Sequence, residues 1–404
     1  MKIKPTSEKA KSAPKVSSRS HLGERVPRLR FPGFEGEWEE QCLETFMYSR
    51  DERQIPSPDA PLMAFIAKLG VAPKGERYDR EYLVKSKDKE YKRTEFNDFI
   101  YSSNNLDVGS IGLNKYGRAV ISDVYEIFTM KDGYAPEFIS ELVQRPRNLH
   151  KVLRFRQGCL YGQYRIYASD FLSVKLLAPD NEEQFKIAGF LQQIDTRITA
   201  QRRLVELLKK HKRGLLRYVF EENIEGDYYS FSEIASRRNE KITPTKDSRL
   251  DCIELENIEQ ETGMLLGSVP LSGQNSLKNL CKPSDLVFGK LRPYLRKFVF
   301  AENECAVSSD TWVLVAAKGI YPKFLFYLIQ SEPFMRAASV SSGTKMPRSE
   351  WSNVANAKFY VPDRTQQETI AACFSEIDRR ILTSQRILTA AQAYKRGLLQ
   401  QLFV

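Results

Sequence analysis

The chain has 404 residues, of which 42% are hydrophobic and 11% aromatic, and its mean hydropathy is −0.45. This length exceeds what one hydrophobic core usually holds, so two or three domains of roughly 150 residues are expected. No segment approaches the roughly 20 apolar residues that a membrane helix needs, and no apolar signal segment opens the chain. We therefore expect a cytoplasmic protein with no membrane partner.

The positive charge is concentrated at the start of the chain. Residues 1–30 carry a formal charge of +7 out of a net +11. Residues 1–24 are rich in Lys, Ser and Pro and cannot form a core, which predicts a basic disordered tail. Nucleic-acid binding by the folded part would therefore depend on local groups of basic residues.

Signatures of metal sites and of catalysis are lacking. Six Cys and three His occur without a Cys-x-x-Cys spacing, so we predict neither a disulfide framework nor a metal site. Gly70 to Glu76 has the first spacing of a phosphate-binding loop but Glu where Lys is required. Asp123 and Asp310 occupy equivalent places and are interpreted as turn residues rather than catalytic carboxylates. No catalytic residue is predicted.

The first globular segment, residues 25–178, is predicted to be a mixed α/β domain. Residues 119–130 are typical of a strand, and residues 137–145 of a short helix. Residues 142–169 contain no Asp or Glu but several Arg among aromatic residues. The candidate DNA-binding residues of this segment are Lys115, Arg118, Arg154, Arg156, Gln163 and Arg165.

A central helical repeat, residues 179–222, follows. From 181 to 220 the apolar residues alternate at spacings of three and four, which predicts an amphipathic helix with a coiled-coil-like seam. The predicted seam residues are Ile187, Leu191, Ile194, Ile198, Val205 and Leu208, with Gln201 and Lys212 in two of its positions. Asp180 is a suitable N-cap, and some 38 residues would make a rod of roughly 57 Å.

Residues 223–361 form a second globular segment that loosely matches the first. Residues 231–241 align with 43–53, residues 285–288 with 98–101, and residues 306–310 with 119–123. Residues 305–316 are typical of a strand and 323–330 of a short helix. The candidate DNA-binding residues here are Lys290, Arg292, Arg296, Lys297, Lys345 and Arg348.

The C-terminal helical repeat, residues 362–404, copies the central one. A shift of 183 residues gives sixteen identities in a 42-residue window, where unrelated sequences give about two or three. The matching seam residues are Ile370, Phe374, Ile377, Ile381 and Leu388, with Ser384 in place of Gln201. Gly214 and Gly397, in the shared Lys-Arg-Gly-Leu-Leu motif, are predicted to mark a bend or a frayed end.

Two packings of the long helices are open. Each helix could cover its own globular segment, or the two could pair with each other. Their length and their matching seams favour pairing, in antiparallel orientation because the second globular segment separates them in the chain. The predicted fold is therefore mixed α/β (α+β): two similar domains separated by an antiparallel two-helix coiled coil, with pseudo-twofold symmetry.

The basic residues predict contacts with nucleic acid. Arg and Lys neutralise phosphates, and Arg, Asn and Gln pair with base edges in the major groove. A solvated surface charge explains any one of these residues, but acid-free basic stretches at equivalent places in both halves favour DNA.

The helical motif is similar to that of a known family. The pattern Pro-Asp…Gln…Ile-Ala…Ile-Asp…Ile…Lys-Arg-Gly-Leu-Leu, present twice, and the opening from Val26 to Trp38 resemble specificity subunits of Type I restriction-modification systems. The resemblance covers about residues 25–404. It implies that 25–178 and 223–361 are target-recognition domains, that 179–222 and 362–404 are helical spacers, and that the chain is not catalytic.

The resemblance also implies a ligand and partners. Each recognition domain would read one half of an asymmetric bipartite site in double-stranded DNA. The helices would dock two methyltransferase subunits, which use S-adenosylmethionine to methylate adenine at N6, together with restriction/motor subunits that use ATP and Mg²⁺. No cofactor is expected in this chain itself.

Two other functions stay open from the residues alone. The chain could be a nuclease or methyltransferase that acts by itself, which turnover of DNA by the purified chain would reveal. It could also be a coiled-coil scaffold without a role on DNA, which an absence of duplex binding would indicate.

Overall fold

A computed structural model describes residues 25–66, 70–73, 89–104, 106, 110–160, 163–222, 226–340 and 346–404. The chain divides into two compact units: residues 1–197 with 391–404, and residues 198–390. The predicted tail 1–24 lies outside the described residues, as do Lys345 and residues 74–76 of the Gly70 to Glu76 segment. None of the helices in the described ranges is both long and apolar enough to cross a membrane.

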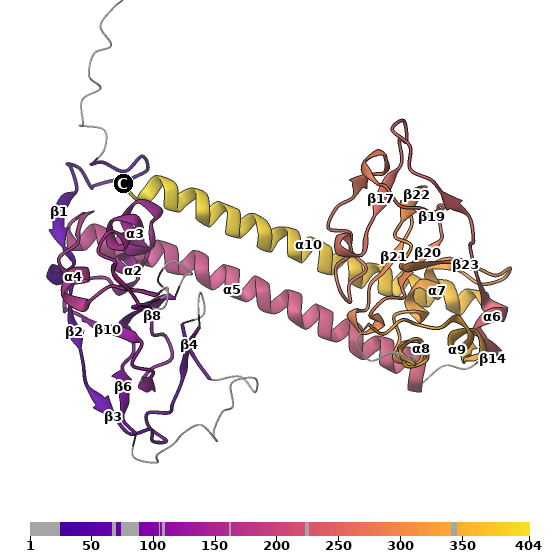
Figure 1. Cartoon of the computed structure of the whole chain (residues 1–404), viewed down its shortest axis with the longest axis horizontal. Helices are drawn as coiled ribbons and strands as arrows, with labels where there is room; N and C mark the ends of the chain where they lie inside the picture. Colours follow the sequence, from indigo (N-terminus) through magenta and orange to yellow (C-terminus); the bar gives the residue numbers. More distant parts are fainter. Residues whose placement is uncertain are drawn as a thin grey trace, which may run out of the picture. The chain divides into compact units, whose positions relative to one another are not determined.

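The first unit contains a mixed α/β domain (Figure 1). Its strands and short helices are β1 (Glu39–Cys42), α1 (Leu43–Phe46), β2 (Met47–Arg50), β3 (Arg53–Gln54), β4 (Ala64–Ile66), β5 (Gly70–Ala72), β6 (Tyr91–Thr94), β7 (Phe99–Ser102), β8 (Ile111–Leu113), β9 (Ala119–Ile121), β10 (Tyr125–Met130), α2 (Pro136–Gln144), α3 (Pro146–Leu153), β11 (Gln157–Leu160), β12 (Gln163–Arg165), α4 (Ala168–Leu172) and β13 (Lys175–Ala178).

The second unit contains a domain of the same kind. Its elements are β14 (Asp227–Ser230), α6 (Phe231–Ile234), β15 (Ala235–Arg237), β16 (Lys241–Ile242), β17 (Asp251–Ile253), β18 (Val269–Pro270), β19 (Lys278–Cys281), β20 (Leu286–Gly289), β21 (Phe298–Phe300), β22 (Cys305–Val307), β23 (Thr311–Ala316), α7 (Pro322–Leu328), α8 (Glu332–Ser339), α9 (Trp351–Asn356) and β24 (Lys358–Val361). Single 3₁₀ turns occur at Leu255–Asn257, Leu271–Gly273 and Pro293–Leu295.

The sheets of the two domains correspond. The four-stranded sheet β2-β10-β7-β8 has its counterpart in β15-β23-β20-β21, and the pair β1-β13 in β14-β24. The sheet β3-β6-β9 matches the first three strands of β16-β19-β22-β17-β18. The correspondence of the two halves therefore extends to strand order, and the mixed α/β fold with two similar domains is confirmed. The alignment of residues 119–123 with 306–310 was wrong by one residue, because Ala119 pairs with Thr94 and Cys281, the equivalent of Thr94, pairs with Cys305.

Two predicted strands were wrong as single elements. Residues 119–130 form β9 and β10, and residues 305–316 form β22 and β23, with each member of a pair in a different sheet. Polar turn residues interrupt both runs, and they include Asp123 and Asp310, which lie in turns as we interpreted. The predicted short helices are present as α2 and α7.

The long helices are α5 (Asn181–Arg217), continued by a π-helical turn at Tyr218–Glu222, and α10 (Arg364–Leu402). Their predicted N-caps are present: Asp180 Oδ1 and Asp363 Oδ1 each accept from the backbone N–H three residues later, at 2.8 Å and 2.9 Å. The frayed end predicted at Gly397 was wrong, because α10 continues to Leu402. Near Gly214 the α-helix does end, at Arg217.

The helices pack antiparallel, with repeat-related contacts. Gln201 Nε2 donates to the carbonyl of Ser384, its own repeat equivalent, at 3.0 Å. In the first unit Lys395 pairs with Asp195 at 2.8 Å, and in the second Lys212 pairs with Asp378 at 2.7 Å. Exchanging the two repeats in the sequence converts one of these ion pairs into the other, so equivalent contacts occur within each unit.

The seam side chains lie mostly inside the protein. Those buried are Ile187, Leu191, Ile194, Ile198, Val205, Phe374, Ile377 and Ile381. Those partly exposed are Leu208, Ile370 and Leu388. At the helix ends Phe403 stacks on Phe138 of α2, and its equivalent Phe220 contacts Phe324 of α7.

Candidate nucleic-acid interface

A repeated ion pair holds the same two elements together in each domain. Arg50, at the end of β2, contacts Asp98 before β7 at 3.0 Å, and Arg238, after β15, contacts Asp285 before β20 at 2.6 Å. Both aspartates are almost completely buried. Burial raises the pKa of Asp98, and the hydrogen bonds that Arg238 donates to Asp285 raise the pKa of Arg238. These two arginines are committed to the fold.

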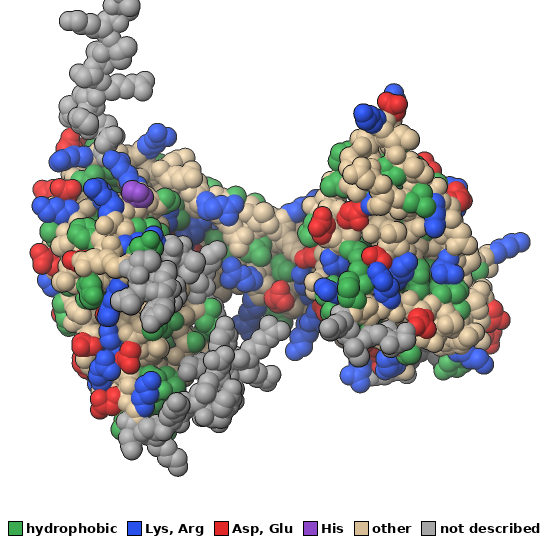
Figure 2. Space-filling model, in the orientation of Figure 1, with side chains coloured by type: hydrophobic (Ala, Val, Ile, Leu, Met, Phe, Trp, Pro, Cys, Tyr) green, Lys and Arg blue, Asp and Glu red, His purple; other side chains and the backbone are tan. Residues whose placement is uncertain are grey.

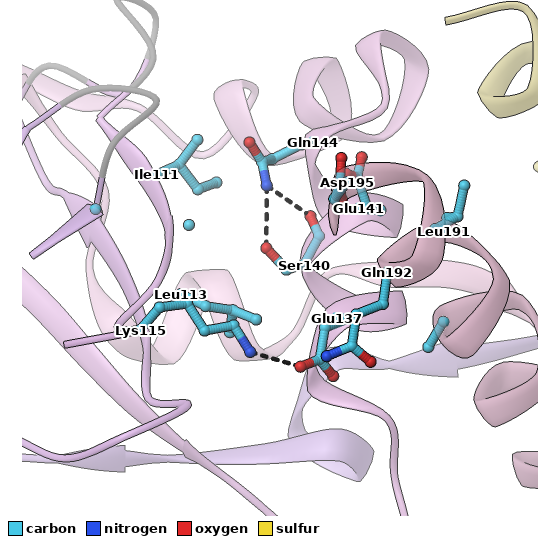
Figure 3. Close-up of a pocket in the computed structure, with 13 residues that line it drawn as sticks. Ile111, Leu113, Lys115, Glu137, Ser140, Glu141, Gln144, Leu191, Gln192 and Asp195 are labelled. Carbon is cyan, nitrogen blue, oxygen red and sulfur yellow. Dashed lines mark hydrogen bonds and ion pairs between the residues drawn. The ribbon is translucent and has the colours of Figure 1, made fainter. Parts of the chain in front are cut away.

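Three of the six candidates of the first domain face carboxylates. Lys115 Nζ lies 2.5 Å from Glu137, Arg118 Nε lies 2.9 Å from Glu95, and Arg165 lies 3.2 Å from Glu126. The Glu137 carboxylate holds Lys115 at the wall of a cavity of ≈ 410 Å³ between β8, α2 and α5 (Figure 3). Two further carboxylates, Glu141 and Asp195, line it, so Lys115 lies in acidic surroundings.

The remaining candidates of the first domain lie around the hairpin β11–β12. Arg154 is exposed and follows α3, while Arg156 stacks over the ring of Tyr164, with 5.7 Å from its guanidinium carbon to the ring centroid. Arg165 stacks over Tyr167 at 5.0 Å. Gln163 begins β12, but its side chain lies outside what the structure describes. Cation–aromatic pairs thus gather at the base of this hairpin.

The candidates of the second domain divide into two groups. Arg296 pairs with Glu332, and Lys297 Nζ donates to the Leu255 carbonyl at 2.5 Å. Both side chains therefore bind groups of the domain itself. Lys290, Arg292 and Arg348 lie together, because the backbone of residues 347–349 pairs with that of 290–292. Lys345 lies outside the described residues.

Two basic residues that the sequence reasoning missed lie beside Lys290. Arg237 and Lys241 line one cavity with it, of ≈ 480 Å³, together with polar and aromatic residues that include Asn279 and Trp312. The alignment of the two halves contained a signal, because it places Arg237 opposite Ser49 of the first domain. On the face seen in Figure 2, Lys and Arg side chains are mixed with Asp and Glu on both units.

Within the described ranges, no three side chains of His, Cys, Asp or Glu gather in an arrangement that could hold a metal ion. The cavity beside Lys290 is lined by guanidinium, ammonium and amide donors from Arg237, Lys241, Lys290 and Asn279, together with the Trp312 ring. Such groups bind phosphates and base edges.

Comparisons with known proteins point to one family. The chain is 22% identical over 303 residues to the Type I restriction enzyme MjaVIII specificity subunit of Methanocaldococcus jannaschii. The match covers 64% of this chain and 71% of that relative. A crystal structure of the S subunit of a Type-I restriction-modification system from M. genitalium superposes with a TM-score of 0.59 and 14% identity, covering 94% of this chain and 99% of that one. No family model matches.

A second solved structure, from work on complex assembly and conformational transition of the type I R-M system, gives a TM-score of 0.51 at 14% identity, with 93% of this chain and 98% of that chain covered. The fold defines a class of proteins in which two similar α/β domains each continue into one long helix, and the two helices pack antiparallel. In sequence and in fold this chain is similar to specificity subunits of Type I restriction-modification systems, the family that its helical motifs predicted.

Proposed function

We propose that this chain is the DNA-reading subunit of a restriction-modification complex and that residues 25–178 and 223–361 are its target-recognition domains. The observation that carries the proposal is the contrast within a shared scaffold. Both domains keep the buried Arg–Asp pair and the same strand order, yet they differ in the charged residues that reach the surface. Such a pair of domains suits an asymmetric bipartite site in duplex DNA.

The helical repeats 179–222 and 362–404 would set the distance between the two half-sites. The ion pairs Asp195–Lys395 and Lys212–Asp378 and the Gln201–Ser384 hydrogen bond fix the register of the helices within the units. Fixed register supports a fixed spacing, just as the geometry of a dimer sets half-site spacing in other DNA-binding proteins.

The partners follow from the family. The same helices would dock two methyltransferase subunits, and restriction/motor subunits would join for cleavage. In this arrangement the methyltransferase supplies S-adenosylmethionine chemistry on an adenine flipped from the duplex, and the motor subunit uses ATP and Mg²⁺. This chain would recognise the DNA sequence at which that chemistry takes place and would perform no catalytic step.

A selection experiment tests the proposal. The full chain, co-expressed with a methyltransferase subunit encoded beside it, is incubated with a random duplex library, and the bound fraction is sequenced. We expect two short sequence blocks separated by a constant gap. A single block, or no enrichment, contradicts the proposal. Cleavage or methylation of DNA by the chain alone would instead establish an enzyme.

A domain exchange tests which segment reads which block. Replacing residues 25–178 by the first domain of another specificity subunit is expected to change one block and leave the other and the gap unchanged. Replacing residues 223–361 in the same way is the matched control and should change only the other block. If either exchange alters both blocks, the two domains do not read independently.

A further inference from the structure

The cavity beside Lys290 is lined by four segments of the second domain: residues 237–241, 276–279, Lys290 and 309–313. Arg237 ends β15, Lys241 begins β16 and Lys290 follows β20. Strand pairing brings them together, because β15 and β20 both pair with β23, and Lys241 lies opposite Asn279 in the β16–β19 ladder. The cavity has a volume of ≈ 480 Å³, and Trp312 and Asn279 are among the residues that line it.

The same place in the first domain holds an internal ion pair between Lys92 and Glu126. Glu126 lies opposite Tyr101 in the β10–β7 ladder, and Trp312 lies opposite the matching Phe288 in the β23–β20 ladder, so Glu126 and Trp312 are equivalent. The Glu126 carboxylate is 2.9 Å from Lys92 Nζ. Lys92 lies opposite Arg53, and Arg53 is the equivalent of Lys241.

Among the described residues, the second domain therefore has one carboxylate fewer than the first domain and more unpaired cations at this place. Lys92 and Glu126 are replaced by Asn279 and Trp312, and Ser49 and Ser103 by Arg237 and Lys290. A remaining arginine of the lining, Arg238, is occupied by Asp285 and Glu240.

The cations of the cavity have little internal compensation from anions, although the Arg237 guanidinium lies over the ring of Trp351, 4.8 Å from its centroid. None of the described residues that line it is acidic. Within the described ranges neither Arg237, Lys241 nor Lys290 makes an ion pair with a carboxylate, and the nearby Asp310 already lies 3.3 Å from Arg348. Burial lowers the pKa of Lys290, and Arg348, Arg237 and Lys241 lower it further against the opposing effect of Asp310. An external anion would relieve this repulsion.

We propose that this cavity seats a phosphate of the DNA backbone, held by Arg237, Lys241 and Lys290, in the half-site that the second domain reads. The inference rests on the proposed function and adds a specific contact to it. Backbone phosphates position a protein on the duplex, so this seat would fix the register of the second domain while other side chains read bases. The first domain has no equivalent seat, because Arg53 there pairs with Asp123 at 2.9 Å.

Substitutions in the full chain, with its methyltransferase partner bound, test the seat. Arg237→Ala, Lys241→Ala and Lys290→Ala are each expected to weaken binding of the selected duplex about tenfold, and to reduce the slope of log affinity against log salt by about 0.9 per lost phosphate contact. Arg53→Ala is the matched control, since it removes the equivalent of Lys241 but leaves the slope unchanged.

Neutralising single phosphates identifies the contact on the DNA. A duplex series in which one phosphate at a time is replaced by an uncharged methylphosphonate should show one position in the second half-site whose loss weakens wild-type binding but has no added effect on Lys290→Ala. If no position shows this coupling, or if the three variants keep wild-type affinity and slope while the bipartite site is still recognised, the seat is wrong and the proposed function stands.

The remaining outcomes concern the source of the anion and the function itself. Inorganic phosphate, compared with chloride at equal ionic strength, should compete only weakly. If it abolishes the difference between wild type and Lys290→Ala at low millimolar concentration, the cavity is a site for free phosphate and the inference is overturned. If the partnered wild-type chain binds no duplex at all, both the seat and the proposed function fail.

Discussion

The two α/β domains differ most outside the contacts that they share. Arg50–Asp98 and Arg238–Asp285 are the same buried ion pair, placed before equivalent strands. A few residues away the first domain has Glu126 where the second has Trp312. The repeated contacts stabilise the fold, whereas the diverged positions change the charge offered to a ligand. Comparison of the two halves thus separates the arginines that hold the fold together from those that differ between the domains, which composition alone does not.

The helical repeats show the same contrast on a smaller scale. Lys395 lies 2.9 Å from Glu141 as well as 2.8 Å from Asp195. Among the described residues Lys212 pairs only with Asp378, and it lies over the ring of Tyr327. Burial lowers the pKa of Lys395, but its two carboxylates outweigh burial and the pKa is raised overall. Burial lowers the pKa of Lys212, and Asp378 only partly opposes it. Equivalent ion pairs therefore differ in strength.

The largest expected effect comes from charges placed in the helix seam. Ile194 and Ile377 are repeat equivalents, and each is only 9% exposed. Replacing both with Asp buries two unpaired carboxylates at a cost of several kcal/mol each, comparable with the whole stability of a domain. We expect loss of helical circular dichroism and of cooperative melting.

Exposed positions of the same helices provide the control. Leu204 and Ile387 are also repeat equivalents, but they are 44% and 52% exposed. Leu204→Asp with Ile387→Asp should leave helicity and melting temperature of the chain nearly unchanged. Equal destabilisation by the two double substitutions would contradict the assigned seam.

A smaller effect should distinguish the two repeated ion pairs. Asp378→Ala leaves Lys212, which is 4% exposed, without its anion, and breaking a buried pair in this way costs about 3 kcal/mol. Asp195→Ala leaves Lys395 with Glu141, and since Asp195 is half exposed we expect a loss of roughly 0–1 kcal/mol. Urea unfolding of the two variants measures the difference, and equal losses would refute the asymmetry.

The Asp378→Ala variant should also depend on pH. In the wild-type chain Asp378 raises the pKa of Lys212 against the effect of burial. The variant lacks this carboxylate, so the pKa of Lys212 in the folded state falls further below the unfolded value. Between the folded and unfolded pKa values the unfolded chain binds more protons, so stability rises with pH. The deficit relative to wild type should therefore shrink toward alkaline pH, and a deficit that grows instead would contradict the buried ammonium.

How much the sequence could predict depends on the range of the interactions. The long helices follow from a local period and a local cap, and Asp180 and Asp363 serve as predicted. The match of Gln201 with Ser384 was likewise visible as two polar positions in equivalent places. The prediction of one strand at 119–130 was wrong because its two ends pair in different sheets, and sheet pairing depends on distant residues. The boundaries of the domains and the seam residues stay predictions.

The candidate interface depended even more on distant contacts. Acid-free stretches suggested free cations, yet Arg165 meets Glu126, 39 residues earlier, and Arg296 meets Glu332, 36 residues later. Conversely Arg237 and Lys241 join Lys290 only through strand pairing and carry no local signature. Which basic residues are available to a ligand is therefore a property of the fold, and the individual DNA contacts stay predictions.

The smallest expected effect sharpens the comparison of the domains at their equivalent turns. Asp310→Asn removes the anion beside Lys290 and Arg348, so the partnered chain should bind its duplex about threefold more tightly, with a steeper salt dependence. Stability should hardly change, because the Arg348–Asp310 pair is exposed. Asp123→Asn frees Arg53 at a place with no proposed phosphate seat, and affinity should stay within error of wild type. Equal gains in both variants would mean that the added charge acts over the whole surface, and the contrast between the two domains would lose its functional meaning.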